Sequence, residues 1–323
     1  MSGFFNFLFL VGALDVVHDF LMGRSLILNG RAFTILKTAA IYVLSSYGVC
    51  LLALFHHSIL LDSIIWLSWP CMFARTFTPT NVVLGSVFCG YGVSLGLKMI
   101  SYHARKTPKS TLTSFLYFLL VPTMCYQDFY PRTKQISVQR IFQLTCQYFV
   151  CLNVLLKIID MSHTRGWFMG PLSFENLFPY CTMVMAAWIV SFYGFFHCYL
   201  NVIAELVMYE DRRFYDDWWN ATTVQEFWRK WNVPMHTWFK SHIHLTRFKR
   251  PAVFMLSAIL HEYVVMAPSG KVCIWPLVAI AAQCPLVIIS NLLPKAFRSN
   301  TLNWFLLWLF GPLALHTIVR EIS

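Results

Sequence analysis

The chain has 323 residues, of which 58% are hydrophobic and 12% charged, and its formal net charge is +11. A mean hydropathy of +0.58 is too high for a soluble globular domain and indicates a polytopic membrane protein. The positive charge lies in the loops between apolar segments. It therefore favours cytosolic loops that meet anionic lipid or a phosphorylated cofactor, and it argues against nucleic-acid binding.

Apolar segments of helical length follow one another along the first half of the chain. Residues 3–23 contain Asp15, His18 and Asp19, so they predict either a first span or an interfacial helix. They lack a basic leader and a clear cleavage site, which favours a membrane segment over a cleavable signal peptide. Further spans are expected at 36–61, 62–76, 81–103 and 141–159, with His56, His57 and Asp62 separating the first two.

Residues 111–126 are apolar but comprise only about 16 residues, fewer than the roughly 20 that a perpendicular span needs. We therefore expect a re-entrant or tilted segment. It runs into residues 121–133, whose prolines and aromatic residues are typical of an interfacial turn.

The second half contains the longest apolar run and the longest polar one. Residues 178–206 carry His197, Asn201 and Glu205 on one helix face, either as polar packing between helices or as part of a site. The basic stretch 207–249 is expected to be cytosolic, with Arg212, Arg213, Arg229, Lys230, Lys240, Arg247 and Lys249 among its charges.

Within this loop, Thr223 to Glu226 form a capping-box pattern. Val224, Phe227, Trp228 and Trp231 then follow at the spacing of an amphipathic helix. Spans at 250–268, 272–293 and 303–319 complete a bundle of about eight or nine membrane helices. The scattered cysteines have no metal-ligand spacing, which is typical of small buried side chains.

An ionisable pair, His261 and Glu262, lies near the middle of the apolar segment 250–268. At about 1.5 Å per residue, His261 is roughly 15 Å along a helix that begins at Pro251, and an ionisable group at that depth indicates a functional site. The alternative is a buried histidine satisfied by Ser257 one turn earlier. A zinc-protease motif is excluded because residue 265 is Val, and nothing but His197 supports a haem site.

Two acids and an amide are packed among four aromatic residues between Phe214 and Asn220. Buried carboxylates need partners, and Arg212 and Arg213 are close in sequence. The alternative is an interfacial aromatic belt with solvated acids. Farther along, His236 could bind phosphate together with Lys240, although composition alone favours an interfacial position.

These stretches resemble the sterol and diacylglycerol acyltransferase branch of the membrane-bound O-acyltransferase superfamily. Residues 214–220 match its FYxDWWN signature, and 257–262 resemble its SAxxHE segment. Residues 130–133 (Tyr-Pro-Arg-Thr) and 197–205 also resemble that branch. The similarity runs from about residue 115 to 293, with four motifs in the family's order.

The resemblance implies an all-α integral membrane protein of about nine helices around an intramembrane chamber, which transfers an acyl chain from acyl-CoA to a lipid hydroxyl at the endoplasmic reticulum. His261 would be the catalytic base and Asn220 the assisting amide. The acyl-CoA path would include Trp218, Trp219, His236 and Lys240. Further substrate-binding candidates in the matched strings are Phe214, Tyr215, Asp217, Ser257, Glu262 and Gln283. No metal or cofactor is expected, and a homo-oligomer is left open.

The acceptor is the open question. Strings such as Cys125-Tyr-Gln127 and Gln283-Cys-Pro-Leu286 resemble diacylglycerol enzymes, whereas Gly311-Pro312 without an intervening Gln resembles some fungal sterol enzymes. We therefore expect diacylglycerol as the acceptor, with sterol as the alternative. A transporter that uses His197, Glu205 and His261 as a proton relay is a rival of another class. A catalytically dead lipid-binding relative is disfavoured because both His261 and Asn220 are present.

Overall fold

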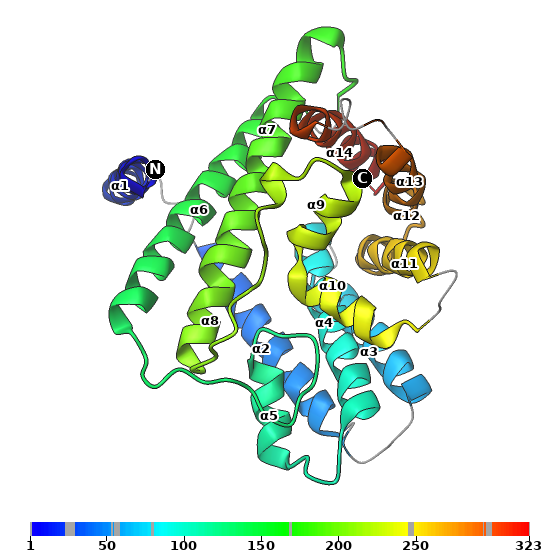
Figure 1. The fold of residues 1–323 in the computed structure, drawn as a ribbon. Helices are drawn as coiled ribbons and strands as arrows, with labels where there is room; N and C mark the ends of the chain where they lie inside the picture. Colours follow the sequence, from blue (N-terminus) through cyan, green and yellow to red (C-terminus); the bar gives the residue numbers. More distant parts are fainter. Residues whose placement is uncertain are drawn as a thin grey trace. The chain divides into compact units, whose positions relative to one another are not determined.

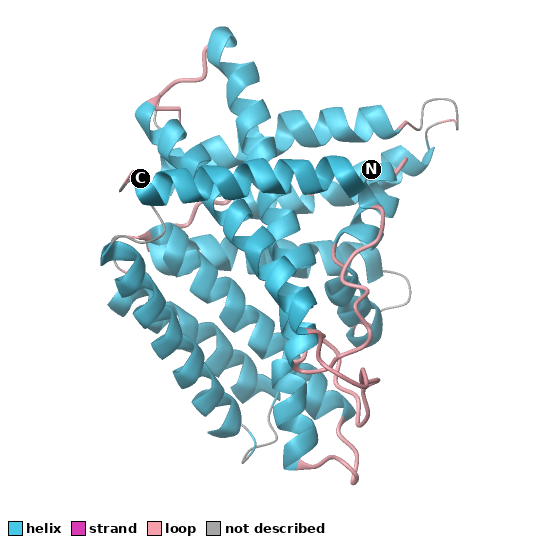
Figure 2. Ribbon diagram, turned by 90° about the vertical axis from the view of Figure 1, so that its left-hand side faces the viewer, coloured by secondary structure: helices cyan, strands magenta, loops and turns pink. Residues whose placement is uncertain are grey.

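The computed structural model describes residues 2–22, 30–52, 54, 59–78, 81–167, 170–244, 249–292, 294 and 299–322. His56, His57 and Arg247 lie outside these residues. Every helix or strand assigned within the described ranges is a helix, apart from one isolated bridge between Arg132 and Tyr209 (Figure 2). The all-α prediction is thus confirmed for the part of the chain that the structure describes.

The helices follow most of the predicted apolar segments, but α2 ends at Leu52 within the segment expected at 36–61, and the segment expected at 272–293 is divided between two helices. The bounds of the helices are α1 Ser2–Leu21, α2 Gly30–Leu52, α3 Ile59–Phe77, α4 Val82–Arg105, α5 Leu112–Leu120, α6 Val138–Thr164, α7 Phe174–Phe192, η2 Tyr193–Tyr199, α8 Leu200–Leu206, η3 Trp218–Asn220, α9 Val224–Trp231, α10 Val233–His242, α11 Lys249–Ser269, α12 Trp275–Ala281, α13 Gln283–Leu292 and α14 Asn300–Ile322.

Seven helical segments within the described residues are long and apolar enough to cross a membrane, so the protein is a multi-pass membrane protein. They are Thr34–Leu52, Val82–Arg105, Val138–Ser162, Phe174–Leu206, Pro251–Ser269, Trp275–Leu292 and Asn300–Ile322. The expected count of about eight or nine is close to this number.

The chain divides into two compact units. Unit 1 comprises Met1–Lys37 and Tyr130–Phe214, and the continuous helical run formed by α7, η2 and α8 lies beside α6 (Figure 1). The acids that interrupt the first apolar segment face a basic partner here, because Lys157 on α6 forms ion pairs with Asp15 and Asp19 on α1. These pairs explain how α1 accommodates two carboxylates.

Unit 2 comprises Thr38–Phe129 and Tyr215–Ser323 and contains the residues of chief interest. Its helices are joined by side chains that donate to backbone carbonyls far away in sequence. The Tyr263 hydroxyl on α11 donates to the Leu67 carbonyl on α3 (2.6 Å), and Arg75 on α3 donates to the Ala267 carbonyl on α11 (2.8 Å). Close packing of α4 against α11 needs Gly85, because a Cβ there would lie 2.6 Å from Pro268.

The predicted short segment at 111–126 is a helix of only nine residues, α5, followed by irregular chain. The helix ends at Leu120 because the residue before Pro122 is biased towards extended backbone. Its last carbonyls are capped by a buried lysine: Lys98 on α4 donates to Phe118, Leu119 and Val121 at 2.8, 2.9 and 2.8 Å. Three donated hydrogen bonds require the protonated ammonium.

Replacing Lys98 by Met should lower the free energy of unfolding by at least about 2 kcal/mol, because each hydrogen bond to a charged group is worth roughly 1.5–3 kcal/mol and buried carbonyls would lose this donor. The measurement is the thermal unfolding of the detergent-solubilised protein. Lys109→Met is the matched control, since Lys109 is exposed on the loop between α4 and α5. Equal stability of Lys98→Met and the wild type would contradict the capping role.

Candidate active site

His261 lies on α11 with one ring nitrogen already engaged. Its Nδ1 is 2.7 Å from the carbonyl oxygen of Ser257, one turn earlier, and 3.5 Å from the Ser257 hydroxyl. A carbonyl oxygen can only accept, so Nδ1 carries the proton in this contact. The neutral ring then has a bare Nε2 lone pair, which is the form that a general base needs. Since the side chain is exposed within the described residues, this nitrogen is open to a reactant.

Glu262, the next residue, has a structural role. It is buried, and its Oε1 accepts the backbone N–H groups of Cys273 (2.8 Å) and Ile274 (3.1 Å). Ile274 is held at φ 61°, a left-handed conformation that costs a non-glycine residue energy, and the carboxylate contact stabilises it. Glu262, a substrate-binding candidate from the sequence, is therefore placed where it fixes the α11–α12 connection.

The signature Phe214–Asn220 ends in the short helix η3, whose aromatic residues have different environments. Trp218 is buried, with its ring 5.7 Å from Phe227 and 5.5 Å from Trp231 between centroids. Trp219 is 42% exposed, and Asn220 is exposed beside it. The stretch is thus neither fully buried nor a uniform interfacial belt: Trp218 anchors the turn, while Trp219 and Asn220 are accessible to a ligand.

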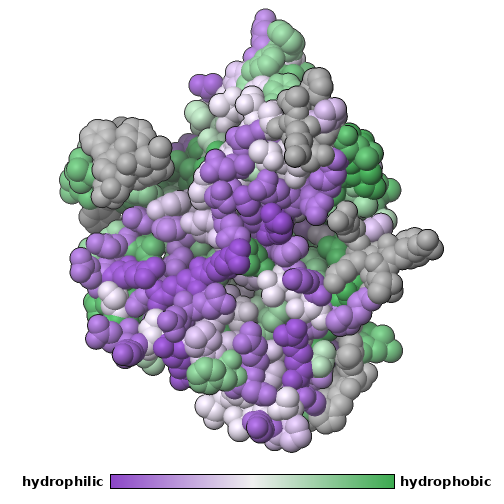
Figure 3. Space-filling view, viewed as in Figure 1, coloured by the Kyte–Doolittle hydropathy of each residue, from purple (hydrophilic) through white to green (hydrophobic). Residues whose placement is uncertain are grey.

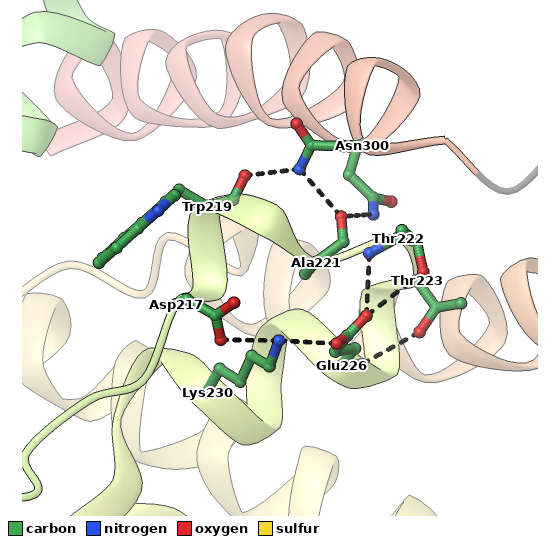
Figure 4. Close-up of polar contacts among 9 residues, drawn as sticks. Asp217, Trp219, Ala221, Thr222, Thr223, Glu226, Lys230 and Asn300 are labelled. Atoms are coloured by element: carbon green, nitrogen blue, oxygen red, sulfur yellow. Dashed lines mark hydrogen bonds and ion pairs between the residues drawn. The ribbon is translucent and has the colours of Figure 1, made fainter.

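Asp217 obtains its partner from α9 rather than from the arginines that precede it in sequence. Lys230 forms ion pairs with Asp217 (2.8 Å) and Glu226 (2.7 Å), as Figure 4 shows. The hydrogen bond from Lys230 holds the pKa of both carboxyls below their ordinary values, and the Asn220 side chain adds to the lowering at Asp217. Arg212, one of the two arginines that were possible partners for the acids of the signature, is instead paired with Glu205.

The capping-box prediction is half right. The Thr223 hydroxyl accepts from the Glu226 amide (3.2 Å) and caps α9 as expected. The Glu226 carboxylate, however, accepts from the Thr222 amide (3.0 Å) instead of returning to Thr223. The other oxygen of the Glu226 carboxylate is paired with Lys230. One carboxylate therefore accepts a backbone amide before α9 and forms the ion pair at the same time (Figure 4).

His236 and Lys240 both lie on α10, one turn apart and exposed. The helix is anchored by Trp238, whose indole N–H donates to the Leu97 carbonyl on α4 (2.9 Å). Figure 3 shows that α9 and α10 lie on a face that carries many hydrophilic residues. A rigid helix with two basic side chains on one exposed face suits an anionic ligand.

Gln283, the first residue of α13, has side-chain partners on α9 and α12. Its side-chain oxygen accepts from the Trp228 indole at 3.4 Å, and its amide is 3.3 Å from the Ala279 carbonyl. Asn291 on the same helix donates to Gln225 (2.6 Å). In this structure Gln283 therefore helps to attach α9 to α13, and its proposed contact with substrate remains a prediction.

The remaining motif residues belong to unit 1. Tyr130–Thr133 pairs with residues 208–210, with Thr133 donating to Met208 (2.9 Å) and Glu210 to Pro131 (3.1 Å). Glu205 is buried and accepts from the Ser137 amide (2.8 Å) and from Arg212. Phe214, at the end of this unit, is buried as well. These contacts support polar packing for Glu205 and a scaffolding role for the Tyr-Pro-Arg-Thr string.

The candidate residues of unit 2 thus form local pairs: Ser257 with His261, Asp217 with Asn220, and Trp218 with Trp219. Tyr215 joins the last pair, 6.1 Å from Trp219 between ring centroids. No hydrogen bond or ion pair links His261 to Asn220 within the described residues. Sequence reasoning gave no role to Asn300, Asn303 and Trp304, although their spacing on one helix face was a visible signal.

Comparison with known proteins decides the family. A model of the membrane-bound O-acyltransferase family matches residues 101–318, about two thirds of the chain. The chain belongs to this family. The match includes every motif named above, from the Tyr-Pro-Arg-Thr string to α14.

Individual relatives are similar over part of their length. Diacylglycerol O-acyltransferase 1C of Glycine max is 34% identical over 221 residues, covering 62% of this chain and 43% of the relative. Diacylglycerol O-acyltransferase 1-2 of Oryza sativa subsp. japonica is 32% identical over 270 residues, 77% of this chain and 54% of the relative. Diacylglycerol O-acyltransferase 1 of Bos taurus is 30% identical over 235 residues, 65% and 47% respectively. The membrane-bound O-acyltransferase chain described here spans about half the length of these curated relatives.

The ion pairs of Lys230 generate a pH prediction. Lowered carboxyl pKa values add stability above the ordinary values of 3.8 and 4.5, and this contribution is lost as pH falls through the folded-state values. Lys230→Met should therefore lower the unfolding temperature by roughly 1–3 °C at neutral pH. The difference from the wild type should vanish as the carboxyls become protonated in acid.

The measurement is thermal unfolding in detergent at a series of pH values between 3 and 7. Arg229→Met on the same helix is the control, since Arg229 is exposed and its removal should give a difference that does not change over this range. A Lys230→Met deficit that persists unchanged in acid would show that the ion pairs do not contribute as inferred.

Proposed function

We propose that this protein is an acyl-CoA-dependent O-acyltransferase that esterifies diacylglycerol to triacylglycerol. The observation that carries the chemistry is the Nδ1 contact of His261 with the Ser257 carbonyl, because it leaves Nε2 as a base in an apolar helix. The acceptor rests on the relatives, which are diacylglycerol O-acyltransferases from two plants and an animal.

In the proposed mechanism, Nε2 of His261 takes the proton from the acceptor hydroxyl while its oxygen attacks the thioester carbon of acyl-CoA. The carbonyl oxygen then bears negative charge, and the amide of Asn220 donates to it. Collapse of this intermediate breaks the carbon–sulfur bond, and the imidazolium returns the proton to the CoA thiolate. The products are the ester and free CoA, with His261 restored to its neutral form.

The CoA head group is anionic and requires cations at the entrance. His236 and Lys240 on α10 supply basic groups there, and Trp219 supplies an exposed ring next to Asn220. We place this face on the cytosolic side of the endoplasmic reticulum membrane, since the connections at residues 105–110 and 207–244 are rich in Arg and Lys. The reaction as written needs no metal or organic cofactor.

The experiment that tests the proposal is the transfer of labelled oleate from oleoyl-CoA by the purified protein, with diacylglycerol and a sterol offered in parallel. We expect label in triacylglycerol. His261→Ala should reduce turnover by about 10²–10⁴-fold, the usual contribution of a general base, while acyl-CoA binding is retained. Label in steryl ester would change the acceptor. Wild-type turnover in His261→Ala would show that His261 is not the general base. Absence of any ester would favour the alternative hypothesis of a transporter.

Lys240→Ala should raise the apparent KM for acyl-CoA by about 3- to 10-fold with little change in kcat, because a charged contact to the CoA phosphates is made equally in the ground and transition states. The measurement is steady-state kinetics at two salt concentrations, since an ionic contact weakens with salt. Arg229→Ala on α9 is the control. A fall in kcat at constant KM would contradict a binding role.

A further inference from the structure

The turn that carries Asn220 is held by the first turn of α14. The Asn300 amide donates to the carbonyls of Trp219 (2.5 Å) and Ala221 (3.1 Å), on either side of Asn220 (Figure 4). The Trp304 indole donates to the Trp219 carbonyl (3.0 Å), and the Asn303 amide to the Ala221 carbonyl (2.8 Å). Each carbonyl thus receives two donors, which is the number that its two lone pairs accept.

The bonds to the Trp219 carbonyl limit where the Asn220 side chain can point, whereas the bonds to the Ala221 carbonyl anchor the end of the turn. The Trp219 carbonyl belongs to the peptide plane before Asn220. The plane after it is fixed by the Ala221 amide, which donates to Trp218 (3.0 Å). When both flanking peptide planes are fixed, φ and ψ of Asn220 are fixed, and so is the direction of its Cα–Cβ bond.

The donors are arranged for this contact by helix geometry. Asn300, Asn303 and Trp304 are spaced i, i+3 and i+4, so they share one face of α14. Trp304 also packs on Trp218, with ring centroids 5.5 Å apart. Asn303 is buried, where an amide is costly unless it is hydrogen-bonded. Its bond to Ala221 accounts for the presence of a polar side chain on this apolar helix.

We propose that Asn300, Asn303 and Trp304 are positioning residues that hold the Asn220 amide in the orientation required to stabilise the oxyanion of acyl transfer. This inference rests on the proposed function of Asn220. Since the donors act through Asn220 and touch no reacting atom, their removal misplaces one catalytic group and leaves substrate binding in place. An error of about 1 Å in such a group can reduce the rate about 10²-fold.

The test is steady-state acyl transfer by Asn300→Ala and Trp304→Phe. Asn300→Ala loses two of the four donated bonds and should lower kcat by about 10-fold or more, with the acyl-CoA KM within about twofold of wild type. Trp304→Phe keeps an aromatic ring against Trp218 and loses one neutral hydrogen bond, so kcat should fall only about 2- to 10-fold. In an Asn220→Ala background, Asn300→Ala should cause almost no further loss.

Asn291→Ala is the matched control, because it removes an amide hydrogen bond of the same kind between α13 and Gln225 (2.6 Å). Its kcat should remain near wild type. An equal loss in this control, a normal kcat in Asn300→Ala, or a full additional loss in the Asn220→Ala background would each overturn the proposal.

Hydrogen–deuterium exchange separates this inference from the proposed function, since it needs no activity. The amides of Asn220 and Ala221 donate to Asp217 and Trp218 (both 3.0 Å) and should exchange slowly. Asn300→Ala should accelerate exchange in peptides covering 217–222, and Asn291→Ala should leave it unchanged. If the wild type makes no ester but this acceleration is seen, the proposed function is wrong, whereas the stabilisation of the turn by the α14 side chains is supported. Unchanged exchange in Asn300→Ala would show that Asn300 does not stabilise the turn.

Discussion

The constraint behind much of unit 2 is that a backbone carbonyl away from water needs a donor. Helices satisfy their interior carbonyls but leave the last carbonyls at the C-terminal end, and those in irregular turns, without a donor. This chain supplies distant side chains instead. Lys98 donates to three carbonyls at the end of α5, and Asn300 donates to two around η3. Because each such bond joins elements far apart in sequence, satisfying the carbonyls also fixes the arrangement of the helices within the unit.

The same constraint separates the functions of two adjacent residues on α11. His261 donates from Nδ1 to a carbonyl of its own helix, so that the lone pair of the neutral ring lies on Nε2, whereas Glu262 accepts two amides from the following loop. Successive residues on a helix point about 100° apart, so the two side chains meet different surroundings. The carboxylate is therefore engaged in structure, and His261 on the neighbouring position has a different hydrogen-bond partner.

Hydropathy and spacing predicted most helices because the apolar runs are long and the polar breaks between them are distinct. The amphipathic helix after Thr223 and the Ser257–His261 contact also follow from local spacing. The partner of Asp217 could not be found from local spacing. Two arginines are nearer in sequence than Lys230, and only the folded α9 brings Lys230 close to Asp217. The donors at the start of α14 could be seen as one polar face, but their target lies about 80 residues earlier, as the sequence separations of 81 and 79 show.

Two kinds of interaction stabilise the turn before α9, one on each side of it. On one flank, Asp217, Glu226 and Lys230 form ion pairs that acid and salt weaken. On the other, amide and indole donors of α14 hold carbonyl oxygens, and none of these groups titrates near neutral pH. The orientation of Asn220 therefore does not depend on the ionic flank alone. An amide placed between an ionic contact and a set of neutral hydrogen bonds retains its geometry when the charge around it changes.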